Sequence, residues 1–173
     1  MASSELSAKG LLDAAHHLVP TGRGRPRGAR LRRAISTAYY ATFTDLTSEV
    51  ARHYPASTAR QAVRRLVTHV AARRACADLR KTRSVPWLRG NPACHPDLLR
   101  FAANFESLCL LRLLADYDHE YSCTKREASA ALGQADSAIE ALASARKQCP
   151  EQLDILCIAA LADDRGRRQI SKR

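Results

Sequence analysis

Two side chains suited to chemistry stand near the end of the most apolar long segment of the chain, residues 101–121 (FAANFESLCLLRLLADYDHEY). If this segment is a helix, positions 101, 105, 108, 112, 115 and 119 share one face, so Arg112 and His119 continue a mostly apolar stripe. A guanidinium can hold a phosphate, and an imidazole can move protons at neutral pH. The two would lie about 10 Å apart along the axis, which suits two points in one groove or a meeting with a second copy.

These residues also have purely structural explanations. Arg112 and Asp116 lie four positions apart, and an exposed ion pair between them would be worth only about 0.3–0.5 kcal/mol. His119 can bond the last carbonyl groups of the helix, and Tyr117 can be a core residue. An open cleft lined by Arg112 and His119 would favour a chemical role, whereas a buried, ion-paired Arg112 would count against catalysis.

The elements that must position these residues are predicted to be helices. Alanine and leucine are abundant while the 173 residues include only 7 glycines, and apolar residues recur at helical spacing. We expect helices over residues 4–19, 29–53, 58–79 and 96–121, one that opens with a capping box at Thr124–Glu127, and a short one from Pro150. The fold class is therefore all-α: an up-down bundle of five or six helices in one domain, residues 1–162, followed by a basic, flexible tail at 163–173.

Positive charge is concentrated in the first part of the chain. The net charge is +11, and residues 1–100 hold 18 Lys/Arg against 6 Asp/Glu, whereas residues 101–173 hold 10 against 11. Such asymmetry favours a polyanion-binding half, although an arginine-rich composition also reflects GC-rich coding. The loop PTGRGRPRG at 20–28 and the start of the next helix can contact RNA or form a solvated surface. The candidate nucleic-acid contacts are Arg23, Arg25, Arg27, Arg30, Arg32 and Arg33.

Several classes of protein are disfavoured by what the sequence lacks. No apolar run reaches the roughly 18 residues of a membrane span, and the N-terminal residues lack the apolar core of a signal peptide, so we expect a cytoplasmic protein. The six cysteines form no C-x-x-C pair, and a zinc site built on Cys94 and His95 would match no known spacing. We therefore expect no disulfide framework, no metal and no cofactor.

Three short motifs together resemble the HEPN family of small helical-bundle proteins, which are commonly dimeric. They are LRRAISTAYYATF at residues 31–43, RLLADY at 112–117 and T-x-x-E-A at 124–128, in order and over roughly residues 5–145. The chain is most similar to small bacterial stand-alone HEPN proteins with an R-x-x-A-D-Y signature. The resemblance implies a helical bundle and a homodimer.

The resemblance also implies an activity, because many HEPN proteins are metal-independent endoribonucleases with an arginine followed by a histidine. Here Arg112 would bind the phosphate and His119 would act as acid and base, supported by Asp116 and Tyr117, in a cleft shared by two copies. The 2′-hydroxyl of RNA would be the nucleophile, which leaves a cyclic phosphate and a 5′-hydroxyl. Such an enzyme would be a toxin or a defence effector.

Two other functions stay open. The sequence His119-Glu120-Tyr121 is similar to HEPN toxins paired with a nucleotidyltransferase antitoxin, in which the tyrosine receives AMP, so Tyr121 is a candidate modification site. Leu113 after the arginine and the six residues between Arg112 and His119 favour instead a non-catalytic HEPN module that binds a nucleotide, RNA or a nucleotidyltransferase partner. A helical scaffold without either activity is the third hypothesis.

Overall fold

The computed structural model describes residues 7–20 and 28–162, and in these the regular secondary structure is helical, with one isolated bridge between Ser84 and Ala93 and no strand. The all-α prediction is confirmed, but seven helices are present in the described part where five or six were expected. The helices are α1 Ala8–Leu18, α2 Gly28–Ala51, α3 Ser57–Leu66, α4 His69–Thr82, α5 Pro96–Tyr117, α6 Lys125–Gln148 and α7 Pro150–Leu161.

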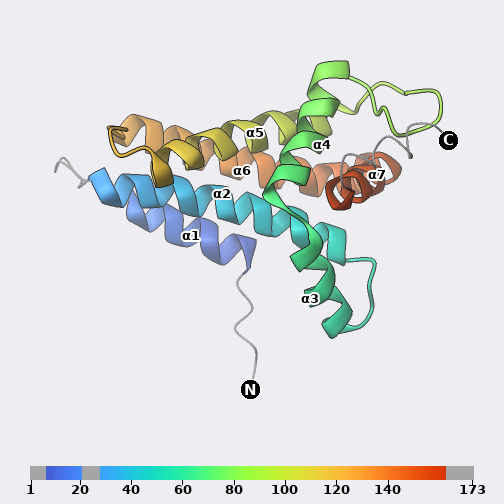
Figure 1. Ribbon diagram of the computed structural model, residues 1–173, viewed down its shortest axis with the longest axis horizontal. Coiled ribbons are helices and arrows are strands. Elements are labelled where there is room, and N and C mark those ends of the chain that lie inside the picture. The colour runs from blue at the N-terminus through green and yellow to red at the C-terminus, as the bar shows by residue number, and fades with distance from the viewer. Residues whose placement is uncertain (1–6, 21–27, 163–173) are drawn as a thin grey trace.

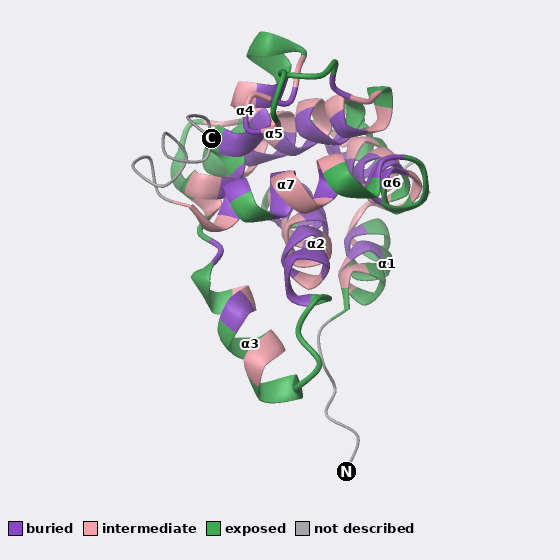
Figure 2. Cartoon of the chain, turned by 90° about the vertical axis from the view of Figure 1, so that its right-hand side faces the viewer, coloured by how far each residue is buried: buried purple, intermediate pink, exposed green. Residues whose placement is uncertain are grey.

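The long helices α2, α5 and α6 run side by side and form the body of the molecule (Figure 1). α1 lies along α2, while α4 crosses α5 and packs against α7 at the opposite end. α3 projects from this body and is largely exposed in Figure 2, with Val63 as its one buried residue. In the described part of the chain, no helix combines the length and the apolar character needed to cross a lipid bilayer.

The helix predicted over residues 58–79 is wrong, because the chain breaks between α3 and α4. Val67 and Thr68 have extended backbones, which suits their β-branched side chains, and the Thr68 hydroxyl accepts a hydrogen bond of 3.1 Å from Ala71 N at the start of α4. α3 begins at Ser57, one residue before the predicted start, and its N-terminus has no side-chain cap. The break makes His69 the first residue of α4, next to α5.

The apolar stripe of α5 is confirmed and anchors the core. Phe101, Phe105 and Leu108 are fully buried, and the rings of Phe101 and Phe105 stack with centroids 5.6 Å apart. Burial of such side chains contributes roughly 1.5–3 kcal/mol each. Ala115 at the far end of the stripe is also buried, so the helix is held along its whole length and its last turn is fixed in place.

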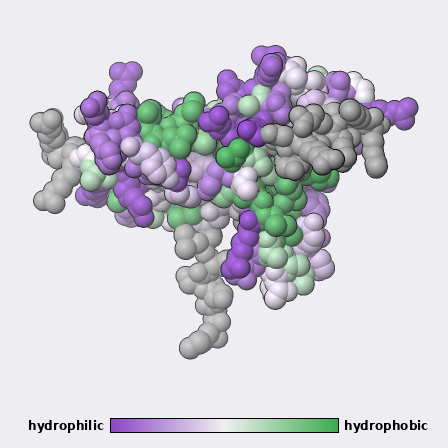
Figure 3. Space-filling model, viewed as in Figure 1, coloured by the Kyte–Doolittle hydropathy of each residue, from purple (hydrophilic) through white to green (hydrophobic). Residues whose placement is uncertain are grey.

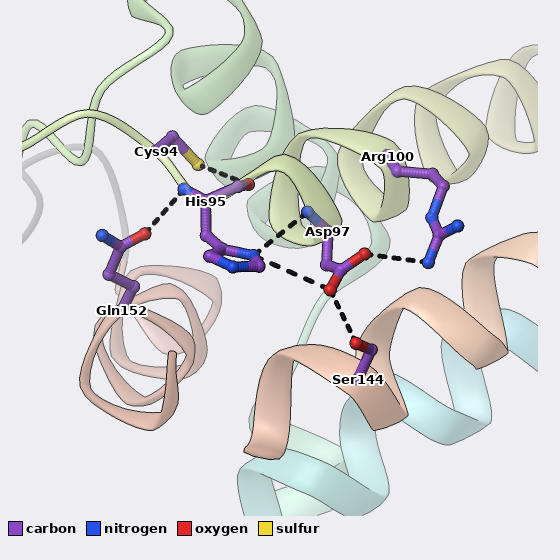
Figure 4. A network of polar contacts seen from close by, with 6 residues as sticks. All are labelled: Cys94, His95, Asp97, Arg100, Ser144 and Gln152. Atoms are coloured by element: carbon purple, nitrogen blue, oxygen red, sulfur yellow. Dashed lines mark hydrogen bonds and ion pairs between the residues drawn. The ribbon is translucent and has the colours of Figure 1, made fainter. Parts of the chain in front are cut away.

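A network of polar contacts fixes the N-terminal end of α5 (Figure 4). His95 caps the helix by accepting a hydrogen bond of 3.3 Å from Asp97 N, and its own backbone N–H donates to Gln152 of α7 at 2.9 Å. The Asp97 carboxylate accepts from the Ser144 hydroxyl of α6 at 2.6 Å. His95 thus joins α5 to α7, and the described residues contain no group of three His, Cys, Asp or Glu side chains that could hold a metal.

A second network lies between α2 and α6. Glu49 is only 1% exposed and accepts hydrogen bonds of 2.8 Å from both Arg52 Nε and Arg146 Nε. Beside it, burial raises the pKa of Asp45 from 3.8 to about 6, with Glu49 adding to the rise and Arg146 opposing it. Because the unfolded chain releases this proton at lower pH than the folded one, folding stability falls as the pH rises from about 4 to about 6.

The predicted capping box at Thr124–Glu127 is confirmed. The Thr124 hydroxyl accepts from Glu127 N at 3.2 Å, and the Glu127 carboxylate accepts from Thr124 N at 2.8 Å, which is the expected capping box of α6. Trp87 is buried and holds the loop between α4 and α5 against the core. The tail at 163–173 lies outside the described residues.

Candidate functional site

The last turn of α5 meets the first turns of α2, so the two longest motifs of the sequence lie in contact. Ser36 Oγ donates to the Asp116 carboxylate, and Arg112 Nη2 donates to Tyr40 Oη at 2.8 Å. Arg32 Nε donates to the Ala115 carbonyl oxygen at 2.7 Å. These contacts join residues 72 to 83 positions apart in the sequence, so the site is a product of the tertiary fold.

Arg112 is a largely buried, ion-paired arginine, with 15% of its side chain exposed. Its Nε lies 2.7 Å from Asp116 Oδ2, but the N–H is not directed at that oxygen with hydrogen-bond geometry, so this contact is an ion pair only. The guanidinium lies 5.5 Å from the ring centre of Tyr40 and 5.1 Å from that of Tyr117, within range of cation–π attraction. The structural explanation of the Arg112–Asp116 spacing is therefore confirmed.

The guanidinium of Arg112 stays protonated among these neighbours. Burial lowers its pKa, but the hydrogen bond to Tyr40 and the charge of Asp116 more than offset that effect, and the pKa lies above its usual value. A permanent positive charge held between two aromatic rings can attract an anion. Within one chain, however, Arg112 does not line an open cleft together with His119.

The predicted position of His119 on the face of Arg112 is wrong, because α5 ends two residues earlier, at Tyr117. Asp118 has an extended backbone, and its N–H donates to the Leu114 carbonyl at 3.1 Å, so His119 does not bond these last carbonyl groups. His119 lies exposed in the following turn. It lines an open pocket of about 610 Å³ with Arg33 and Asp116, separate from the pocket that Arg112 lines.

The two tyrosines near this end differ from their predicted roles. Tyr117 is 64% exposed and is not a core residue. The Tyr121 hydroxyl is enclosed without a hydrogen-bond partner in the described part of the chain, and burial raises its pKa to about 12. In this conformation the hydroxyl is not presented to a modifying enzyme.

The structure describes three of the six arginines that were expected to contact nucleic acid. Arg23, Arg25 and Arg27 lie outside the described residues. Arg30 donates to the His17 carbonyl at 2.6 Å and Arg32 to that of Ala115 at 2.7 Å, so both have structural partners. Arg33 is exposed, lines the pocket of His119, and its side chain has no ion pair among the described residues.

Sequence reasoning missed a second pocket, of about 300 Å³, between α4 and α5. Three arginines and a histidine line it, and no carboxylate does. Its lining residues are Tyr39, His69, Val70, Arg73, Arg74, Cys109, Arg112 and Leu113. Thr68, as a helix-capping residue, was the signal that could have placed His69 at a helix start.

The hydrogen bond between Tyr39 and His69 defines the state of this histidine. Tyr39 Oη lies 2.7 Å from His69 Nδ1, and burial raises the tyrosine pKa, so the phenol keeps its proton and donates it. Burial and the nearby charge of Arg112 lower the pKa of His69, which favours the neutral ring. A neutral ring that accepts at Nδ1 carries its proton on Nε2, which makes no hydrogen bond to any described residue.

The outward face of α5 carries an exposed apolar stripe, formed by residues at helical spacing i, i+3, i+4 and i+7. These are Leu110, Leu113, Leu114 and Tyr117, each between 38% and 64% exposed. Figure 3 shows the corresponding hydrophobic patch over the C-terminal half of α5. Leu66 and Val70, at the junction of α3 and α4, are exposed as well. We call the four α5 residues the α5 stripe.

No protein-family model matches the sequence, and neither the curated proteins nor the solved structures give a significant match to this chain. The assignment of a function thus depends on the geometry described above.

Proposed function

We propose that this chain is a HEPN-like module that binds RNA through the pocket between α4 and α5. The observation that carries this proposal is the lining of that pocket, which holds Arg73, Arg74, Arg112 and His69 without a carboxylate. Such a set of donors suits an oxyanion, and a net charge of +11 favours binding to the phosphate groups of a polyanion such as RNA. Arg112, held between Tyr40 and Tyr117, would supply a fixed positive charge.

The same proposal includes a homodimer. The α5 stripe is an apolar helix face next to the Arg112 site, and a monomer in water would leave it exposed. A second copy that covers it would pair one α5 with the other about a two-fold axis. The two basic pockets would then lie at one surface of the dimer, where a single RNA strand can contact both.

A second candidate function is a metal-independent endoribonuclease, acting as a toxin or defence effector. It is favoured by the exposure of His119 at the end of α5, directly beyond the α5 stripe. In a dimer joined through these stripes, His119 would lie near the shared surface and could exchange protons with RNA bound there. A nucleotidyltransferase antitoxin would be the partner in that case, and Tyr121 would have to turn outward before accepting AMP.

One experiment tests both functions with purified full-length protein in EDTA. Fluorescence anisotropy of a labelled single-stranded RNA measures binding between about 50 and 200 mM salt, where three or four phosphate contacts predict a log–log slope of about −2 to −3. Gel analysis of the same samples measures cleavage by the wild type and by His119→Ala and Arg112→Ala.

Binding with that salt dependence supports the RNA-binding module, and no binding at about 50 mM salt refutes it. Cleavage that both substitutions abolish would establish the nuclease. Binding without cleavage, or cleavage that survives both substitutions, refutes a nuclease built on Arg112 and His119.

A further inference from the structure

The pocket between α4 and α5 differs in kind from the pocket that His119 lines. It has about 300 Å³ against about 610 Å³ and is the more enclosed of the two. The larger pocket includes the carboxylates of Asp116 and Glu120 in its lining, whereas the smaller one has only cationic and neutral groups. An enclosed pocket whose charged lining groups are all cationic selects a compact group of high negative charge over an extended backbone.

Three side chains have donors left for a ligand there. Arg73 is exposed and makes no hydrogen bond or ion pair to any described residue. Arg112 uses Nε and Nη2 for its partners, and its Nη1 has none in the described part of the chain. His69 presents its Nε2–H, because Tyr39 occupies Nδ1 at 2.7 Å.

The start of α4 adds to this positive environment. His69 is the first residue of a helix of 14 residues whose N-terminus is capped by Thr68, and the positive end of the helix dipole therefore lies at the pocket. His69 donates as a neutral ring, so its contribution does not require protonation. The pocket thus combines two permanently charged arginines, a neutral donor and a helix N-terminus.

From these observations we infer that the α4–α5 pocket binds a phosphate monoester, the phosphorylated end of an RNA strand, in preference to an internal phosphodiester. A monoester carries a charge of about −1.5 to −2 at pH 7 and three free oxygens, whereas a diester carries −1 and two. A lining with arginines and no carboxylate matches the higher charge, Arg73 and the unoccupied Nη1 of Arg112 supply donors, and the enclosed shape matches a chain end. This inference rests on the proposed RNA binding, which it makes more specific.

The test compares one RNA sequence with three ends: 5′-phosphate, 3′-phosphate and hydroxyl at both ends. Anisotropy competition with the full-length protein should show about tenfold tighter binding of one phosphorylated form over the hydroxyl form. The preference should disappear in Arg73→Ala and should persist in Arg89→Ala, which removes an exposed arginine from the loop beyond the far end of α4. Free 5′-AMP and inorganic phosphate are added as competitors to show whether the RNA chain is needed.

Tyr39→Phe gives a second, independent readout. It removes one buried hydroxyl, frees His69 Nδ1, and should reduce the preference for the phosphorylated end a few-fold without abolishing RNA binding. RNA binding that does not distinguish the three ends, in protein shown to be folded, overturns the inference and leaves the proposed function intact. Direct binding of AMP or phosphate, measured by titration calorimetry, without any RNA binding overturns the proposed function and leaves an anion pocket for a small phosphorylated molecule.

Discussion

Substitution of Arg112 by methionine should destabilise the protein by about 2–3 kcal/mol. The side chain loses a charged hydrogen bond to Tyr40, worth about 1.5–3 kcal/mol, and two ring contacts of about 0.5–1 kcal/mol each. It also loses an ion pair with the partly exposed Asp116, worth up to about 1 kcal/mol. Relief of guanidinium burial and the apolar packing of methionine offset part of this sum.

The loss is measured by urea denaturation followed by circular dichroism, within a double-mutant cycle that includes Asp116→Asn. The Asp116 carboxylate also accepts a hydrogen bond from Ser36, so a single substitution at Asp116 would remove two interactions. The cycle isolates the coupling free energy between Arg112 and Asp116, which we expect to be about 1 kcal/mol. If Arg112→Met is as stable as the wild type and the coupling is zero, the guanidinium is not held by these contacts. That result would refute the conclusion that Tyr40, Tyr117 and Asp116 hold the Arg112 guanidinium and stabilise the fold.

Three further predictions concern pH, assembly and capping. Asp45→Asn should stabilise the protein by about 2–3 kcal/mol at pH 8 and by almost nothing near pH 4, in urea denaturation across that range, because the cost of ionising a carboxyl with a pKa of about 6 is removed. A difference that does not change with pH contradicts the account, and exposed Glu140→Gln is the control. Leu114→Asp should convert a dimer to a monomer in light scattering after gel filtration, and no change would place the interface elsewhere. Thr124→Ala should cost about 1 kcal/mol, measured by the same denaturation.

The sequence was sufficient to predict the helical class and the inner face of α5. Phe101, Phe105 and Leu108 recur at the spacing of one helix face, and burial of large side chains is the dominant force on such a segment. The capping box of Thr124 and Glu127 could also be predicted, because it is a local arrangement of two side chains. Both predictions depend on residues that lie a few positions apart.

The end of α5 could not be predicted in the same way. Residues 118–124 contain no glycine or proline, so the helical pattern continues to His119 without a local stop signal. Groups from α2 form hydrogen bonds with the last turn of α5. Arg32 Nε donates to the Ala115 carbonyl oxygen, which has no partner within the helix, and Ser36 Oγ donates to the Asp116 carboxylate. A two-residue error at this end removed His119 from the predicted face.

The pocket between α4 and α5 was hidden for a related reason. His69 and Arg73 lie in a segment predicted as the middle of one helix, where they would count as part of a solvated basic face. The break at Val67 and Thr68 turns the chain and brings them against Arg112. Only the tertiary packing of α4 on α5 shows that these residues share a pocket.

The contacts of Arg32, Ser36 and Tyr40 with the end of α5 span 72 to 83 residues of sequence, which has a consequence during synthesis. A nascent chain that ends before α5 contains the basic residues of α2, α3 and α4, but without α5 these residues cannot form the site. Long-range closures of this kind form late, after the intervening helices have emerged from the ribosome. The pocket between α4 and α5, which needs Cys109, Arg112 and Leu113, therefore cannot form until α5 has left the ribosome.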